Sequence, residues 1–202
     1  MQTLRDAVTL LDDGPPDEQE NDLNRRLYRA IIAAQTNDAR QGLEHLSVVV
    51  PEGRNPPAAS DAERTAREHK IPDFYWSYVD YLAPDPEAVA RQFVVECKRL
   101  TSSTKAWNYI TQYIDAGVVR FVTEAHGYGK EAPSGAMVGY LQTINLDDAL
   151  SGVNSHSTAN GLPVLVIRQR SDDAPVELDH RLDRPFPVTP FLLWHLWTRV
   201  TP

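Results

Sequence analysis

The sequence contains one cysteine, Cys97, among its 202 residues. A single cysteine excludes an internal disulfide framework and a zinc site built from several cysteines. No apolar run approaches the roughly 20 residues that a membrane-spanning helix needs. The first residues also lack the basic flank and the apolar centre of a secretory signal peptide. From these absences we expect a cytoplasmic protein with no membrane partner.

Clustered positive charge is missing as well. Lysine and arginine together number 20 against 28 aspartates and glutamates, which gives a formal net charge of −8. This balance argues against a protein that coats nucleic acid by charge alone, because phosphate binding needs grouped cations. It leaves open an enzyme that acts on nucleic acid, since acidic metal ligands themselves lower the net charge. In that case the charge indicates that tight binding needs a metal, a homodimer or a protein partner.

Histidine-based metal motifs are also absent. The six histidines are scattered, with no pair at helical spacing, and we expect each to be structural or solvated. The glycine-containing loop 126–130 lacks the spacing and the hydroxyl residue of a phosphate-binding P-loop. The sequence therefore offers no cysteine, histidine or P-loop chemistry, and the candidate site has to come from acidic and basic residues.

The length suits one domain with an elaborated end. We expect a flexible N-terminal segment over residues 1–16, a core over 17–142, and a C-terminal elaboration over 143–202 that packs on the same domain. Strands and helices alternate along the core, which predicts an α/β fold with a mixed sheet and helices on its faces.

Hydrophobic periodicity and turn residues give the expected elements. A helix capped by Asp17 runs over residues 17–35. The expected strands span 46–50, 74–82, 93–98, 118–122, 136–142 and 163–168. Further helices are expected at 61–70, at 107–115 with Gly117 as its C-cap, and at 146–153. A proline-rich loop falls at 54–60 and a turn at 84–86. The apolar end 188–200, in which Phe191, Trp194 and Trp197 have helical spacing, is expected to pack on the core.

Two charged residues end the apolar strand at 93–98. Alternate residues of a strand point to the same face, so Glu96 and Lys98 project together and Cys97 points the other way, into the core. Charges at the end of a buried strand need compensation. A hard divalent cation bound to Glu96 through oxygen would supply it, and Lys98 could then stabilise the attacking water or the charge on a phosphate.

A second carboxylate is needed on a neighbouring strand, and two aspartates qualify. Asp73 opens the strand before Glu96, and Asp80 lies in the same strand region. Their separation is odd, so a regular strand would put them on opposite faces and only one would reach the metal. Pro72 next to Asp73 favours Asp73, and Asp80 stays open as the alternative.

Pro72-Asp73 followed by Glu96-Cys97-Lys98 resembles the motif of the PD-(D/E)XK nuclease superfamily. The resemblance covers residues 17–142 and implies a restriction-endonuclease-like mixed central sheet flanked by helices, with an αβββαβ core. It implies that Asp73 and Glu96 hold Mg²⁺, with Mn²⁺ as a substitute, and that Lys98 assists the nucleophile. Glu20 matches the position of a further glutamate on the first helix, near the metal.

The function implied by this resemblance is metal-dependent hydrolysis of phosphodiester bonds by an endonuclease. The substrate would be nucleic acid, DNA in the first instance, in restriction or defence against foreign DNA. Two other classes remain open from the residues alone. One is a catalytically inactive scaffold or binding module with the same fold. The other is an unrelated α/β domain in which Glu96 and Lys98 form a surface ion pair.

Overall fold

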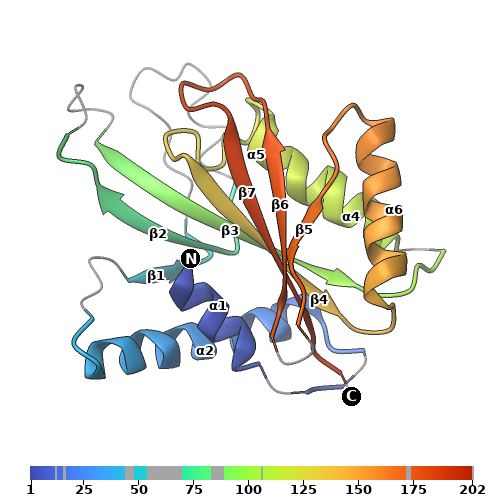
Figure 1. The fold of residues 1–202 in the computed structure, drawn as a ribbon, viewed down its shortest axis with the longest axis horizontal. Helices are drawn as coiled ribbons and strands as arrows, with labels where there is room; N and C mark the ends of the chain where they lie inside the picture. The colour runs from blue at the N-terminus through green and yellow to red at the C-terminus, as the bar shows by residue number, and fades with distance from the viewer. Residues whose placement is uncertain are drawn as a thin grey trace.

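A computed structural model describes residues 1–11, 13–15, 17–43, 48–53, 70–82, 89–105, 107–171 and 174–201. In these ranges a seven-stranded mixed sheet has the strand order β1-β2-β3-β4-β7-β6-β5, with helices on both faces (Figure 1). No described helix combines the length and the apolar character needed to cross a membrane. The strands are β1 (Val49–Pro51), β2 (Phe74–Val79), β3 (Ala90–Leu100), β4 (Ser134–Leu141), β5 (Val166–Gln169), β6 (Val176–Leu182) and β7 (Phe191–Arg199). The helices are α1 (Gln2–Thr9), α2 (Glu20–Arg40), α4 (Tyr109–Tyr113), α5 (Val119–Val122) and α6 (Leu146–Ala159), with a π-helical segment η2 (Ile114–Val118) between α4 and α5.

The first half of the sheet is an antiparallel meander followed by a parallel crossover. β1 pairs with β2 and β2 with β3, both antiparallel. The chain then passes through α4, η2 and α5 and returns in β4, which is parallel to β3. A parallel pair requires such a crossover connection. The expected mixed α/β sheet is therefore confirmed, and the order helix, three strands, helix, strand is present in α2, β1–β3, α4 and β4.

The sheet is covered on both faces, which gives two hydrophobic cores. On one side α1 and α2 pack against alternate residues of β3 and β4, such as Val95, Cys97 and Val138. On the other side α4, α5 and α6 pack against the residues in between, such as Val94 and Met137. Because successive strand residues point to opposite faces, a strand buried on both faces is apolar almost throughout. This explains the unbroken apolar stretch Val94–Val95 before the charged residues.

The N-terminal segment 1–16 differs from the flexible segment that the sequence predicted. Residues 2–9 form α1, and Leu4, Ala7 and Val8 are buried against α2 and the sheet. Their spacing of three and four residues makes one apolar stripe, which the interpretation as a flexible segment overlooks. The predicted cap at Asp17 is wrong, because α2 begins at Glu20 with Gln19 as its N-cap and no side-chain cap hydrogen bond.

The strand predicted at 118–122 is wrong. These residues continue the helix through η2 and α5, with Val118 and Phe121 buried. β-branched valines favour strands, but burial of an apolar helical face outweighs that preference here. Gly117 is consequently inside the helix and not its C-cap. A Cβ at Gly117 would lie 2.7 Å from Cε of Met137, so glycine permits close packing of this helix on β4.

Several other boundaries move. Pro51 belongs to β1, β2 ends at Val79, and β3 begins at Ala90. The predicted loop 54–60, residues 61–69 of the predicted helix 61–70, and the turn 84–86 lie outside the described residues. The apolar end packs on the core as expected, but as strand β7. Its helical spacing was misleading, because Phe191 and Trp197 join one core while Trp194 packs against the other.

Arg184, after β6, is a buried guanidinium that binds backbone carbonyls. Its nitrogens donate to the carbonyl oxygens of Tyr128 at 3.2 Å, Gly129 at 2.8 Å and Ala132 at 2.9 Å. The guanidinium also lies over the ring of Phe191, 3.7 Å from its centroid. Burial lowers the pKa of Arg184 to about 10. This one side chain therefore holds the loop between α5 and β4 in place.

Replacing Arg184 with lysine should destabilise the fold strongly. Lysine keeps the charge but lacks the planar fork, so several buried carbonyls lose their donors. We expect the free energy of unfolding to fall by about 2–4 kcal/mol in urea denaturation. The exposed Arg181→Lys is the matched control and should change it by less than about 0.5 kcal/mol. Equal stability of the two variants would contradict the assigned role.

Candidate functional site

The candidate site lies where β3 extends past the start of β2. In the β2–β3 register Phe74 is opposite Val95, so β2 begins there and residues 96–100 of β3 have no partner from β2. Asp73 stands at this point, and its carboxylate Oδ2 accepts a hydrogen bond of 2.6 Å from the backbone N–H of Cys97. The Asp73 carboxylate thus accepts the hydrogen bond that a backbone carbonyl of a longer β2 would otherwise accept. The edge of β3 beside Asp73 is left available to residues from elsewhere.

Lys98 joins the acidic residues. Its Nζ lies 3.0 Å from Oε1 of Glu96 and 3.0 Å from Oε1 of Glu20, the first residue of α2. It also donates to the carbonyl oxygen of Cys97 at 2.8 Å. Asp73, Glu96, Lys98 and Glu20, the four residues singled out in the sequence, are therefore close together in space.

Asp80 does not take part in this cluster. It pairs with Arg91 at 3.2 Å, at the opposite end of β2 from Asp73. Of the two aspartates that the sequence left open, Asp73 is the one beside Glu96. Cys97 has no exposed surface and packs in the core on the α1–α2 side, as its alternation with Glu96 predicts. Burial raises the pKa of its thiol, which suits a packing residue.

Three further residues hold the acidic side chains, and the sequence did not reveal them. Asn24 donates to Oδ1 of Asp73 at 3.0 Å, and Asn24 itself accepts from the hydroxyl of Tyr140 at 2.9 Å. Arg120 of α5 donates to Oε1 of Glu96. Asn24 carries a signal that could have been used, because it follows Glu20 by one helical turn and so shares its face. Arg120 carries none, because the valine-rich segment around it predicts a strand.

The electrostatics of the cluster are dominated by burial. Glu96 is 1% exposed and Lys98 5% exposed. Burial, followed by the charge of Glu96, raises the pKa of Asp73 to about 8. Burial raises the pKa of Glu96 too, against the opposing charges of Lys98 and Arg120. For Lys98, burial alone would lower the pKa, but Glu96, Asp73 and Glu20 outweigh it and raise the pKa, so the ammonium stays charged.

The donor set fits a hard divalent cation in its chemistry. When all three are ionised, Asp73, Glu96 and Glu20 carry three negative charges and Lys98 and Arg120 return two, so the deprotonated cluster has an excess of negative charge that a cation would offset. Oε2 of Glu96 is buried and has no hydrogen-bond partner among the described residues. Such an orphaned oxygen, with two more carboxylates near, suits an oxygen-loving cation. Among the described residues, however, no three acidic, histidine or cysteine groups already form a metal cage.

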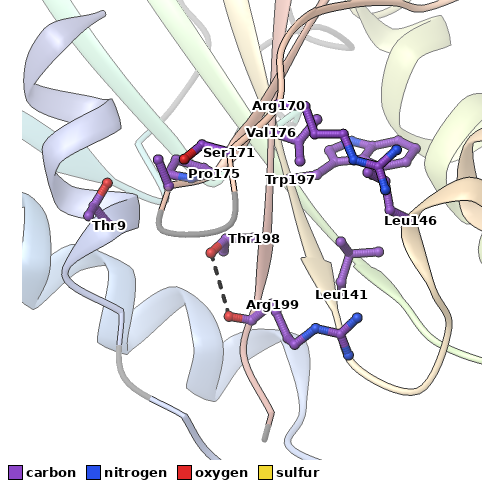
Figure 2. Close-up of a pocket in the computed structure, with 11 residues that line it drawn as sticks. Thr9, Leu141, Leu146, Arg170, Ser171, Pro175, Val176, Trp197, Thr198 and Arg199 are labelled. Atoms are coloured by element: carbon purple, nitrogen blue, oxygen red, sulfur yellow. Dashed lines mark hydrogen bonds between the residues drawn. The ribbon is translucent and has the colours of Figure 1, made fainter.

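Two hollows in the surface help to place the site. A groove of about 400 Å³ is lined by Asp73 together with residues of α2 and β1. A second hollow of about 340 Å³ lies by the ends of β4 and β7 and includes Arg170, Trp197 and Arg199 (Figure 2). No carboxylate is among the described residues that line this second hollow, and Arg170 is paired with Asp147 at 3.0 Å. Of these two hollows, the first adjoins the acidic cluster.

Comparisons with known proteins give no relative. No protein-family model, no curated protein and no solved structure matches this chain. Function is therefore inferred from the geometry and chemistry of the cluster itself.

The raised pKa of Asp73 predicts how stability changes with pH in metal-free buffer. In the unfolded chain Asp73 ionises near its ordinary value of 3.8, whereas in the folded chain it ionises at about 8. The folded state thus holds the extra proton between these values, and stability falls as the pH rises through this window. From pH 6 to pH 9 we expect a loss of about 1–2 kcal/mol from this residue, because its partial exposure moderates the full effect.

The measurement compares slopes of unfolding free energy against pH for wild type and Asp73→Asn. The asparagine side chain of this variant can accept only one of the two hydrogen bonds that Asp73 accepts, so absolute stabilities are not comparable. Between pH 6 and pH 9, the free energy of unfolding of the wild type should fall by about 1–2 kcal/mol more than that of Asp73→Asn. Asp22→Asn, an exposed neighbour on α2, should keep the wild-type slope. Parallel slopes for wild type and Asp73→Asn would contradict the assigned environment of Asp73.

Proposed function

We propose that this protein is a metal-dependent nuclease that hydrolyses phosphodiester bonds in nucleic acid, DNA in the first instance. The observation that carries the proposal is the meeting of Asp73, Glu96 and Lys98, with Glu20, at the open edge of β3. A random Glu-x-Lys pair on a surface strand would be exposed, whereas Glu96 and Lys98 are both almost fully buried. Burying charged groups is costly even when they are paired, and groups of this kind are concentrated at functional sites.

The order of helices and strands supports the same proposal, although this order alone does not define a nuclease. The resemblance in the sequence implied an αβββαβ core, and the chain has that order in α2, β1–β3, α4 and β4. Asp73 comes from the start of the second core strand and Glu96 and Lys98 from the third, as in the motif of the PD-(D/E)XK superfamily. The setting in restriction or defence remains an analogy with that superfamily.

Each residue has a definable part in the proposed chemistry. Asp73 and Glu96, joined by Glu20, would hold Mg²⁺, with Mn²⁺ as a substitute. Bound there, the cation supplies a Lewis acid that polarises a phosphoryl oxygen and acidifies a water molecule. Lys98 remains an ammonium because of its raised pKa. It would therefore neutralise developing negative charge and not remove a proton.

Two other residues prepare the carboxylates. Asn24 fixes Oδ1 of Asp73 while the Cys97 N–H fixes Oδ2. Arg120 holds Oε1 of Glu96, which leaves Oε2 available. Preorganised ligands of this kind reduce the reorganisation needed when substrate and metal bind.

Removing the Lys98 side chain should slow cleavage strongly. In the test, purified protein is incubated with plasmid, linear duplex, single-stranded DNA and RNA in Mg²⁺ or Mn²⁺. We expect Lys98→Ala to lower the cleavage rate at least about a hundredfold, as loss of a preorganised electrostatic group does elsewhere. Lys105→Ala, an exposed lysine outside the cluster, should keep the wild-type rate.

The comparison also guards against contaminating nucleases. Equal cleavage by wild type, Lys98→Ala and Glu96→Gln would overturn the assignment, because all three would then carry the same impurity. No cleavage of any nucleic acid by the wild type would leave the non-catalytic binding module as the better description.

Metal binding can be measured independently of activity. Divalent cations that bind only the folded state stabilise it by RT ln(1 + [L]/Kd), which is about 1.4 kcal/mol at ten times Kd. We expect Mn²⁺ to raise the melting temperature of the wild type but not that of Glu96→Gln. Asp22→Asn should respond like the wild type. No response of the wild type at millimolar Mn²⁺ would count against the metal site.

A further inference from the structure

The groove beside Asp73 is built from one face of α2 and from β1. Asn21, Asn24, Arg25, Tyr28 and Arg29 line it from α2, spaced three and four residues apart as on one helical face. Pro51 and Glu52 line it from the end of β1, and Asp73 and Phe74 line it from the start of β2. Asp73 belongs to the acidic cluster, so the groove leads directly to the proposed metal site.

The cations of the groove are available for an anionic ligand. Arg29 is exposed and has no ion-pair partner among the described residues. Arg25 pairs with Asp22 at 2.6 Å, but both side chains are mostly exposed. Because an exposed ion pair is weak, a phosphate can replace Asp22 as the partner of Arg25 at little cost in free energy. Tyr28 adds an aromatic ring between the two arginines in sequence, and the ring is only partly buried. A guanidinium for phosphate next to an aromatic ring for a base is the composition of single-strand binding sites.

The dimensions and charge argue against a paired helix in this groove. A volume of about 400 Å³ is that of a small-ligand pocket, which can take one nucleotide but not a duplex. Duplex-binding proteins neutralise many phosphates with clustered lysine and arginine. Here the lining contains only two arginines, together with the carboxylates of Glu52 and Asp73, in a chain of net charge −8.

We propose that this groove receives one unpaired nucleotide next to the phosphate to be cleaved, so that the substrate is single-stranded DNA. Arg29 binds the phosphate of that nucleotide and Tyr28 stacks on its base. The inference rests on the proposed function for its cleavage step, but the groove can also be tested by binding alone.

The cleavage experiment compares one sequence as a single strand and as a fully paired duplex, in Mn²⁺, with Lys98→Ala alongside. The single strand should be cut at least about tenfold faster. Arg29→Ala and Tyr28→Ala should each raise KM for it roughly tenfold, the size expected for losing one stacking or phosphate contact. Tyr28→Phe keeps the aromatic ring and should therefore have the wild-type KM. Arg40→Ala, an exposed arginine in the last turn of α2 outside the groove, is the matched control.

A second readout uses fluorescence anisotropy of a short labelled single strand without metal. Arg29→Ala and Tyr28→Ala should weaken its binding by a similar factor, and Arg40→Ala should not. Lys98-dependent cleavage that is as fast on duplex as on single strand would overturn the groove assignment and leave the proposed nuclease standing. Absence of any Lys98-dependent cleavage would overturn the nuclease. In that case, unchanged binding by both groove variants would overturn the groove as well.

Discussion

One hydrogen bond sets the geometry of the whole site, the 2.6 Å contact from the backbone N–H of Cys97 to the carboxylate of Asp73. An unpaired N–H at a buried strand edge is unfavourable, and a continuing β2 would have satisfied it. Since β2 begins only at Phe74, the aspartate side chain does so instead. This places a carboxylate beside Glu96 and leaves room for Glu20 to reach Lys98. A longer β2 would close the edge and separate these groups.

The contact has an electrostatic cost that shapes the surrounding residues. Asp73 and Glu96 are carboxylates in a buried setting, and the pKa of each is raised. Lys98 and Arg120 offset part of the charge, and Asn24 fixes the orientation of Asp73. Replacing buried ion pairs with well-packed apolar residues is often neutral or stabilising, so a network like this one is more typical of sites kept for chemistry than of sites kept for folding. The groove along α2 adds two exposed cations, Arg25 and Arg29.

The sequence predicted the local parts of this structure and missed those that depend on distant packing. Strand alternation gave the shared face of Glu96 and Lys98 and the buried side of Cys97, since both follow from a period of two. Pro72 favoured Asp73 over Asp80, but the alternation left Asp80 open, because the choice between them depends on where β2 begins. Arg120 and Arg184 were missed for a related reason. Arg120 lies in a valine-rich segment whose strand propensity is overruled by burial as a helix, and nothing around Arg184 in the chain indicates the loop that it binds.

Arg184 also supports the acidic cluster from a position far along the chain. It binds the carbonyl oxygen of Tyr128, the backbone N–H of Tyr128 donates to the carbonyl oxygen of Arg120 at 3.3 Å, and the Arg120 side chain holds Glu96. Asp73, Glu96 and Lys98 are all synthesised long before Arg184 leaves the ribosome. A nascent chain therefore carries the acidic residues without the support that orders them, and the cluster is completed only when the last strands have joined the sheet. The order of Glu96 thus depends on contacts that run from α5 to the residue range after β6, and not on the motif alone.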